Sequence, residues 1–261
     1  MNSSLSTDTS SELLNISQLH FRVDGLHILR GLDLQVRPGE MVGIIGPNGC
    51  GKTTLFNSIS GFNRRIEGSI KFKGKDIGHL EPYVRSRMGI GRVFQNFGIF
   101  REMTLVENLL TSLEAKDTIW QGLFPWSKRT KELKEVAFDL ISQVKLSHLA
   151  NKKAESLSGG QMRLLEIIRA VAFGADLFLL DEPTAGVSPR MKQEVAQQII
   201  SLKESGKTVL VIEHDINFIE SFCERIVVLN EGTVVLDGTP EIIRSDKRLQ
   251  EIYFGEKAAA T

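Results

Sequence analysis

One short stretch, GPNGCGKTT at residues 46–54, constrains the fold of this chain more than any other feature. It matches G-x-x-x-x-G-K-[ST], a pattern in which glycines allow backbone N–H groups to surround phosphates. The apolar run EMVGIIG leads into it, and KTTLFNSIS follows with the composition of a helix. Such a loop needs a buried parallel strand before it and a helix N-terminus after it, where the helix dipole favours anions. We therefore predict an α/β core built around a phosphate-binding loop.

Hydrophobic periodicity divides the rest of the chain into strands and helices. The runs LLNISQLHFRV and HILRGLDLQV, joined by Asp24-Gly25, and the run GSIKFKG predict a small antiparallel layer. ADLFLLD and KTVLVIEH are continuous apolar runs like EMVGIIG, typical of strands buried in a parallel sheet. Near the C-terminus, RIVVLNEGTVVLDG predicts a hairpin with residues 230–232 at its tip, and PEIIRSDKRLQEIYFGE predicts one closing helix.

A helical insertion is predicted between about Gly98 and Leu157, where β-branched runs give way to helical periodicity. Its clearest segment is TKELKEVAFDLISQVKL, with one apolar stripe along the predicted helix. The members of that stripe are Leu133, Val136, Ala137, Leu140, Ile141 and Val144.

Composition excludes several classes of protein. The 32 basic and 32 acidic side chains cancel, so no nucleic-acid ligand is expected. The longest apolar runs fall far short of the roughly 20 residues needed to span a bilayer. The N-terminus lacks the basic and apolar regions of a secretory signal, and Cys50 and Cys223 form neither a disulfide framework nor a metal pattern. These features predict a cytoplasmic protein.

Four residues suggest phosphoryl-transfer chemistry. In the phosphate loop, Lys52 would reach the β and γ phosphates and Thr53 would ligate Mg²⁺. The run LFLLDEP ends a buried strand with Asp181, whose carboxylate could hold Mg²⁺ beside the loop. The adjacent Glu182 could act as general base toward water. An acidic strand end alone is common, so this interpretation depends on the phosphate loop.

Two further residues are candidate site residues only because the motifs described above are also present. His214 ends the run TVLVIEH, and a lone histidine at a strand end is more often structural than catalytic. Its strand is expected in the same sheet as that of Asp181, which would bring His214 within reach of a γ-phosphate. Gln95, at the junction of core and helical insertion, would ordinarily be a polar loop residue but is a candidate metal or water sensor.

Taken in order, GPNGCGKTT, Gln95, LSGGQ at residues 157–161, LFLLDEP and His214 resemble the motifs of the ATP-binding cassette (ABC) family of transporter ATPases. The resemblance runs from about Leu13 to Glu256. It implies a P-loop NTPase (RecA-like) core with an antiparallel β subdomain and an inserted α-helical subdomain. The predicted divisions are a disordered tail at 1–12, the β layer and phosphate-loop half at 13–95, the helical subdomain at 96–157, the second half of the core at 158–238, and a C-terminal helical extension at 239–261.

The resemblance also assigns roles to individual residues. Glu182, His214 and Lys52 would be catalytic, and Mg²⁺ would lie on Thr53, Gln95 and Asp181. ATP would be bound by Gly46, Pro47, Asn48, Gly49, Cys50, Gly51, Lys52, Thr53 and Thr54. A chain with a complete phosphate loop has no need of a second glycine-rich helix start for the same nucleotide. The resemblance implies that Ser158, Gly159, Gly160 and Gln161 contact the γ-phosphate held by an opposing subunit, the glycines giving the backbone N–H groups access.

Three positions depart from the family pattern. Val23 stands where an aromatic residue that stacks on adenine is expected, and it is the candidate contact with the base. Ser188 replaces an aspartate in the loop after Glu182. Cys50 replaces a small residue of the phosphate loop and is expected to behave as one.

Within the family, the segments GIGRVFQNFGIFREMTLVENLL and EIYFGE are similar to the ATPases of branched-chain amino acid importers. Urea-type importers and lipopolysaccharide-export ATPases share the pattern, and a cassette in iron–sulfur cluster assembly or a module that regulates without hydrolysing are alternatives. The resemblance implies a second ATPase subunit, a different chain being favoured over an identical one, integral membrane permeases and a periplasmic solute-binding protein. The chain would lie peripherally on the cytoplasmic face of the inner membrane. The transported substrate and the direction of transport are not encoded in these motifs.

Overall fold

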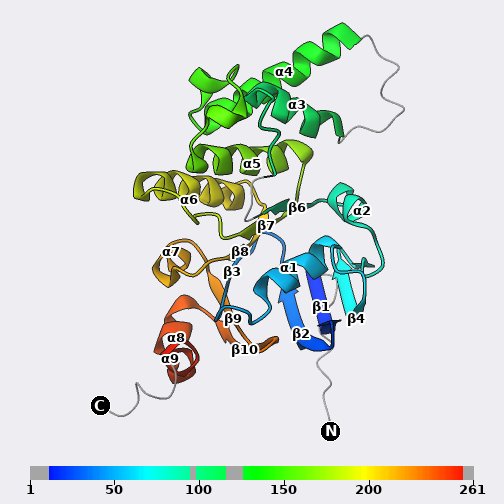
Figure 1. The fold of residues 1–261 in the computed structure, drawn as a ribbon, viewed down its shortest axis with the longest axis vertical. Coiled ribbons are helices and arrows are strands. Elements are labelled where there is room, and N and C mark those ends of the chain that lie inside the picture. Colours follow the sequence, from blue (N-terminus) through cyan, green and yellow to red (C-terminus); the bar gives the residue numbers. More distant parts are fainter. Residues whose placement is uncertain (1–11, 95–97, 116–125, 255–261) are drawn as a thin grey trace. The chain divides into compact units, whose positions relative to one another are not determined.

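The computed structural model describes residues 12–94, 98–115 and 126–254 and divides into two compact units. Unit 1 comprises residues 1–85 and 214–261, and unit 2 comprises residues 86–213. Figure 1 labels the elements of both. None of the helices in the described ranges combines the length and apolar character that crossing a bilayer requires.

Unit 1 contains the predicted antiparallel layer. Its four strands are β1 (Leu14–Val23), β2 (Leu26–Val36), β4 (Ile66–Phe72) and β5 (Lys75–Asp76), in the order β2-β1-β4-β5. The β1–β2 hairpin turns at Asp24 and Gly25, both with positive φ (49° and 80°). Two positive φ angles give the turn a twist that matches that of the paired strands. The layer and the turn were both predicted correctly.

Unit 1 also carries the strand that leads into the phosphate loop. All five residues of β3 (Met41–Ile45) are buried, and β3 pairs in parallel with β9 (Arg225–Asn230). The predicted C-terminal hairpin is confirmed, because β10 (Thr233–Gly238) pairs antiparallel with β9. The helices of this unit are α1 (Lys52–Ser60), α7 (Ile216–Glu220), α8 (Pro240–Ser245) and α9 (Lys247–Phe254), and α2 (Pro82–Arg87) spans the division between the units.

The prediction of a single closing helix after residue 239 is wrong. The helix is interrupted at Asp246, whose extended backbone (φ −77°, ψ 122°) ends α8. The Asp246 carboxylate accepts a hydrogen bond from the Arg248 N–H at 2.9 Å. A carboxylate that bonds a backbone N–H two residues later favours a helix start over helix continuation.

Unit 2 joins three parallel strands to a set of helices. The strands are β6 (Ile90–Val93), β7 (Leu177–Asp181) and β8 (Thr208–Ile212), with β7 between the other two. The helices are α3 (Leu105–Ala115), α4 (Trp126–Gln143), α5 (Gly159–Phe173) and α6 (Pro189–Glu204), with short 3₁₀ turns η3 (Ser147–Leu149) and η4 (Ala154–Ser156). Within this unit α5 contacts α3, α4, α6 and β6 (Figure 1).

The apolar stripe predicted on the helical insertion is buried at four of its six positions, and Leu133 is half-buried. Ala137, Leu140, Ile141 and Val144 are buried, whereas Val136 is 44% exposed. Val136 and Ile141 are about 140° apart around the helix, so Val136 lies at the edge of the stripe. The predicted divisions at residues 95, 157 and 238 mark functional segments and stay predictions.

Candidate functional site

The phosphate loop of unit 1 is a tight connection between β3 and α1. Gly46 directly follows β3, and α1 begins at Lys52, as predicted. A Cβ atom on Gly46 would lie 2.1 Å from the Leu229 carbonyl oxygen and 2.8 Å from Cys50 Sγ, and its φ is 150°. The loop therefore packs directly on the β9 backbone, and only glycine fits at its first position.

Lys52 turns back onto this loop. Its Nζ donates hydrogen bonds to the carbonyl oxygens of Gly46 at 2.7 Å and Pro47 at 2.9 Å, and the residue is 6% exposed. The first turn of α1 carries no acidic residue, so the positive end of the helix dipole is unopposed there. Thr53 is exposed on that turn. An ammonium group, a helix N-terminus and a hydroxyl thus occupy one turn of the chain, a donor set suited to phosphate.

Cys50 is buried within the loop. It is 5% exposed, and burial raises the pKa of its thiol despite the nearby Lys52. Its carbonyl oxygen accepts the Gly232 N–H at 3.0 Å, and the Gly232 carbonyl oxygen accepts the Arg30 N–H at 3.0 Å. These bonds tie the loop to the tip of the β9–β10 hairpin and to β2. Val23, at the far end of the β1–β2 hairpin, is 43% exposed.

Unit 2 carries the predicted carboxylates at the end of β7. Asp181 is the last residue of β7, and its Oδ2 accepts a 2.9 Å hydrogen bond from the Arg92 guanidinium on β6. Its Oδ1 is buried with no hydrogen-bond partner among the described residues. Burial raises the pKa of Asp181, and Arg92 opposes that shift. A buried carboxylate oxygen without a partner can accept a cation, so this position fits Mg²⁺.

Glu182 follows in an unusual backbone conformation. Its φ is 47°, in the left-handed region that residues with a Cβ seldom occupy. Its N–H donates to the Ile212 carbonyl oxygen, at the end of β8, at 2.9 Å. The side chain is partly exposed. Strained backbone of this kind tends to occur at functional sites.

Two charged residues near these carboxylates were missed by the sequence reasoning. Arg92 pairs with Asp181, and Glu213 accepts two hydrogen bonds from Thr184. A signal existed for each. Arg92 lies within a short apolar strand, and Glu213 directly follows the buried strand β8, so both are charged residues in segments that bury their side chains.

The glycine-rich segment 158–161 begins α5 in unit 2. Ser158 is the N-cap and forms a capping box with Gln161: Ser158 N–H donates to Gln161 Oε1 at 2.9 Å, and Gln161 N–H donates to Ser158 Oγ at 3.4 Å. A Cβ on Gly160 would lie 2.7 Å from Met191 Cβ, in the first turn of α6. Gly160 therefore has a packing reason to be glycine within this chain, in addition to the access that sequence reasoning assigned to it.

The other predicted site residues lie in both units. His214 belongs to unit 1, is exposed, and lies two residues beyond the end of β8. The prediction that the strand before His214 lies in the same sheet as the Asp181 strand is confirmed, because β7 and β8 pair in parallel. Gln95 lies outside the described residues. Ser188 is the N-cap of α6 and is exposed, with no side-chain capping bond. Unit 1 thus holds the phosphate loop and His214, and unit 2 holds Asp181, Glu182 and segment 158–161.

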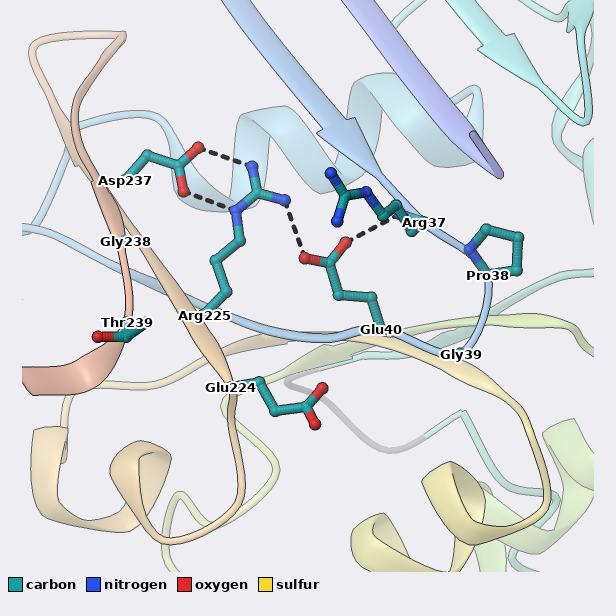
Figure 2. Close-up of a pocket in the computed structure, with 9 residues that line it drawn as sticks. All are labelled: Arg37, Pro38, Gly39, Glu40, Glu224, Arg225, Asp237, Gly238 and Thr239. Carbon is teal, nitrogen blue, oxygen red and sulfur yellow. Dashed lines mark hydrogen bonds and ion pairs between the residues drawn. The ribbon is translucent and has the colours of Figure 1, made fainter. Parts of the chain in front are cut away.

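A cavity of about 500 Å³ in unit 1 is distinct from the phosphate loop. Figure 2 shows the Arg225 guanidinium between Asp237, at 2.6 Å, and Glu40, at 3.0 Å. Hydrogen bonding to Asp237 raises the pKa of Arg225. Glu40 precedes β3 whereas Gly46 follows it, so the cavity lies at the opposite end of that strand. Arg225, Glu40 and Asp237 are engaged with one another, as expected of a structural ion-pair network.

Comparisons with known proteins extend the evidence beyond these motifs. Residues 29–185 match the family model described as "ABC transporter". A relative from Pseudomonas aeruginosa, named "High-affinity branched-chain amino acid transport ATP-binding protein BraF", is 39% identical over 253 residues, covering 95% of this chain and 99% of that protein. A relative from Archaeoglobus fulgidus, "Probable branched-chain amino acid transport ATP-binding protein LivG", is 37% identical over 246 residues, covering 94% and 96%.

Similarity to solved structures supports the same family. A nucleotide-free ATP-binding cassette from an ABC transporter superposes with a TM-score of 0.82 at 36% identity, covering 94% of this chain and all of that one. The ADP conformation of an ATP-binding cassette of an ABC transporter gives 0.82 at 35% identity, covering 94% and 99%. The fold predicted from the ordered motifs is therefore confirmed. Because the family model spans more than half of the chain and the relatives align along nearly all of it, the chain belongs to the ABC transporter family, as an ATP-binding cassette.

Proposed function

We propose that this chain is the ATP-hydrolysing subunit of a membrane importer for branched-chain amino acids or a related small polar solute. The observation that carries the hydrolytic part is the pair Asp181–Glu182 at the end of β7, in a chain whose β3 leads into a phosphate loop. The importer assignment is supported by the names of relatives that align with nearly the whole chain.

Nucleotide binding is assigned to Gly46–Thr54. The backbone of this loop and the N-terminal end of α1 would surround the phosphates, with Lys52 directed to the β and γ phosphates. Lys52 Nζ is held at the loop by two carbonyl oxygens, so it would exchange these neutral acceptors for a charged one. A phosphate oxygen adds Coulomb attraction between opposite charges, which a carbonyl oxygen does not provide. This difference favours the phosphate contact.

Thr53, Gln95 and Asp181 would hold Mg²⁺. The unpartnered Oδ1 of Asp181 is the feature of the described residues that supports this assignment. When bound, Mg²⁺ supplies charge neutralisation on the phosphate oxygens. The chain's contribution is a buried carboxylate whose other oxygen, Oδ2, is fixed by Arg92.

Glu182 would act as general base toward water, and His214 would stabilise the γ-phosphate. Phosphoryl transfer demands positioning and charge stabilisation more than covalent chemistry, so the fixed backbone of Glu182 is suited to the role. Its N–H bond to Ile212 holds the turn at the carboxyl end of β8. Val23 stands at the position assigned to the adenine, where its exposed side chain would offer an apolar contact without ring stacking.

Segment 158–161 is assigned to the ATP of an opposing subunit. The Ser158–Gln161 capping box orders the first turn of α5, whose remaining N–H groups suit a phosphate oxygen. The opposing subunit is taken to be a second ATPase, a different chain rather than an identical one. The further partners are integral membrane permeases and a periplasmic solute-binding protein, with the chain peripheral on the cytoplasmic face of the inner membrane.

The permease contact is assigned to the segment after Gln95. Phe100 and Met103 are 47% and 37% exposed there. The buried Asn108 side chain bonds the N–H and carbonyl oxygen of Phe100, each at 2.9 Å, and this fixes the segment on α3. Exposed apolar side chains on a rigid segment suit a protein partner.

The test is transport by the assembled complex. The chain would be co-expressed with partner permeases and a second cassette, reconstituted in vesicles with a solute-binding protein, and supplied with labelled leucine. We expect ATP-dependent uptake that Glu182→Gln reduces at least about a hundredfold while nucleotide binding persists, because only water activation is removed. Undiminished hydrolysis by this variant would refute the base assignment, and hydrolysis without uptake of any branched-chain amino acid would refute the substrate.

A further inference from the structure

Glu213 is a buried carboxylate with no role in the site described above. It follows the end of β8 and is 5% exposed. Its Oε1 accepts two hydrogen bonds from one residue, the Thr184 N–H at 2.9 Å and the Thr184 hydroxyl at 2.7 Å. Thr184 is itself 3% exposed and lies two residues after Glu182. A buried charge with two short bonds to a single turn specifies the position of that turn.

That turn is the one with the strained Glu182 backbone. The left-handed conformation is unfavourable for a residue with a Cβ, so it persists only where neighbouring bonds impose it. On one side of Glu182, its own N–H is bound to the Ile212 carbonyl oxygen. On the other side, Thr184 is bound to Glu213. Both anchors come from the end of β8, which therefore holds the turn before and after the strained residue.

A buried basic residue also lies near Glu213. The buried Arg163 on α5 interacts favourably with Glu213 and also with Asp181 and Glu166. The Arg163–Glu166 pair is 2.7 Å long and nearly fully buried. The carboxylate of Glu213 thus has two donors from Thr184 and a nearby cation, which offset the cost of burying it.

We propose that Glu213 is a positioning residue for the general base: through Thr184 it holds Glu182 in the left-handed conformation from which its carboxylate acts. The catalytic consequence rests on the proposed function of Glu182, whereas the conformational part does not. Glu213 touches no reacting atom in this assignment. It acts through the turn at residues 182–184.

The conformational part is tested by unfolding of the full chain. The reference is Glu182→Gln, which removes the charge but keeps the Cβ, and it is compared with Glu182→Gly, which also removes the Cβ penalty. With Glu213 present, glycine should raise the Tm by about 2–4 °C over glutamine, because strain is released. In a Glu213→Ala background the turn can relax by itself, so the gain should fall to less than half.

An equal gain in both backgrounds, or no gain in either, would overturn the proposal. If Glu213→Ala does not fold, Thr184→Val replaces it, because valine keeps the shape and the backbone N–H and removes only the hydroxyl bond. The Tm difference between Glu182→Gly and Glu182→Gln is then measured in the Thr184→Val background, where we expect it to fall by less than in Glu213→Ala. Neither measurement needs turnover, so a wrong assignment of Glu182 as base would leave the result interpretable.

The catalytic part is tested by kinetics of the assembled complex. Glu213→Ala should lower kcat at least about tenfold with nucleotide Kd changed less than about twofold, because misplacement affects chemistry rather than binding. Glu213→Gln retains a carbonyl acceptor and should remain within about threefold of the parent, and Thr184→Ser, which retains both donors, should do the same. A purely structural role would instead lower Tm without changing kcat per folded molecule, and that result would also overturn the proposal.

Discussion

Substituting alanine for Gly160 tests whether this glycine is required by packing inside the chain. The new Cβ would lie 2.7 Å from Met191 Cβ, 2.9 Å from Cγ and 3.0 Å from Cε. Carbon atoms in favourable contact are about 3.5–4.0 Å apart, so the nearest pair is too close by about 1 Å. Met191 Cγ and Cε can rotate away, but Cβ is fixed to the backbone of α6. Either α5 and α6 separate or the side chain strains.

The expected loss of stability follows from two opposed terms. Overpacking of this kind costs about 1–3 kcal/mol, and alanine in place of a helical glycine regains about 0.5–1 kcal/mol. The net loss is about 1 kcal/mol in the free energy of unfolding, or a Tm lower by about 2–4 °C. Denaturant unfolding followed by circular dichroism, with Tm from calorimetry, would measure both quantities on the full chain.

Second-site variants separate this clash from other effects. Met191→Ala removes Cγ and Cε but leaves the closest atom, so it should rescue Gly160→Ala only slightly. Met191→Gly removes all three atoms and should restore most of the loss, once its own helix cost of about 1 kcal/mol is subtracted in a double-mutant cycle. Gly160→Ala as stable as the parent, or rescue equal in both variants, would refute the packing explanation.

Two further predictions concern the phosphate loop and the metal carboxylate. At pH 8, Cys50 should react with iodoacetamide at least about tenfold more slowly in the native chain than in the unfolded chain, because burial restricts access and raises the thiol pKa. Peptide mass spectrometry measures the two rates, and equal rates would contradict the burial of Cys50 in the loop. Asp181→Ala should lower the free energy of unfolding by about 3–5 kcal/mol because it removes the carboxylate from a buried ion pair with Arg92. Denaturant titration without nucleotide or metal measures this loss, and a much smaller value would mean that the pair contributes little.

Local sequence patterns predicted most helices and strands correctly but did not predict where a helix is interrupted. The phosphate-loop helix and the buried strands follow from motif and apolar runs, since both signals are contained within one element. The break at Asp246 depends on one carboxylate bonding to Arg248 N–H, a local alternative to helix that periodicity does not reveal. The spacing of apolar residues predicted that Val136 would be buried, but Val136 lies at the edge of the stripe on α4 and is 44% exposed.

The site was predictable as a set of motif residues and not as a network. Asp181, Glu182 and the phosphate loop have short sequence signatures. Their partners do not: Arg92 bonds Asp181 across 89 positions, and Glu213 bonds Thr184 across 29. The only sequence signal for such residues is a charge in a segment expected to be buried, which indicates a partner without identifying it.

The glycines of segment 158–161 show how a motif residue can satisfy two requirements at once. At Gly160 the close approach of Met191 excludes a side chain whatever lies on the other side of α5. A variant such as Gly160→Asp would therefore disturb helix packing as well as any phosphate contact, and lost turnover alone would not demonstrate that contact. Gly160→Asn supplies the matched control, because asparagine has the size of aspartate without its charge. If Gly160→Asp loses ATP-dependent association with the opposing subunit and Gly160→Asn at the same folded fraction does not, the loss is electrostatic and belongs to the phosphate. Equal losses in the two variants would assign this glycine to packing alone.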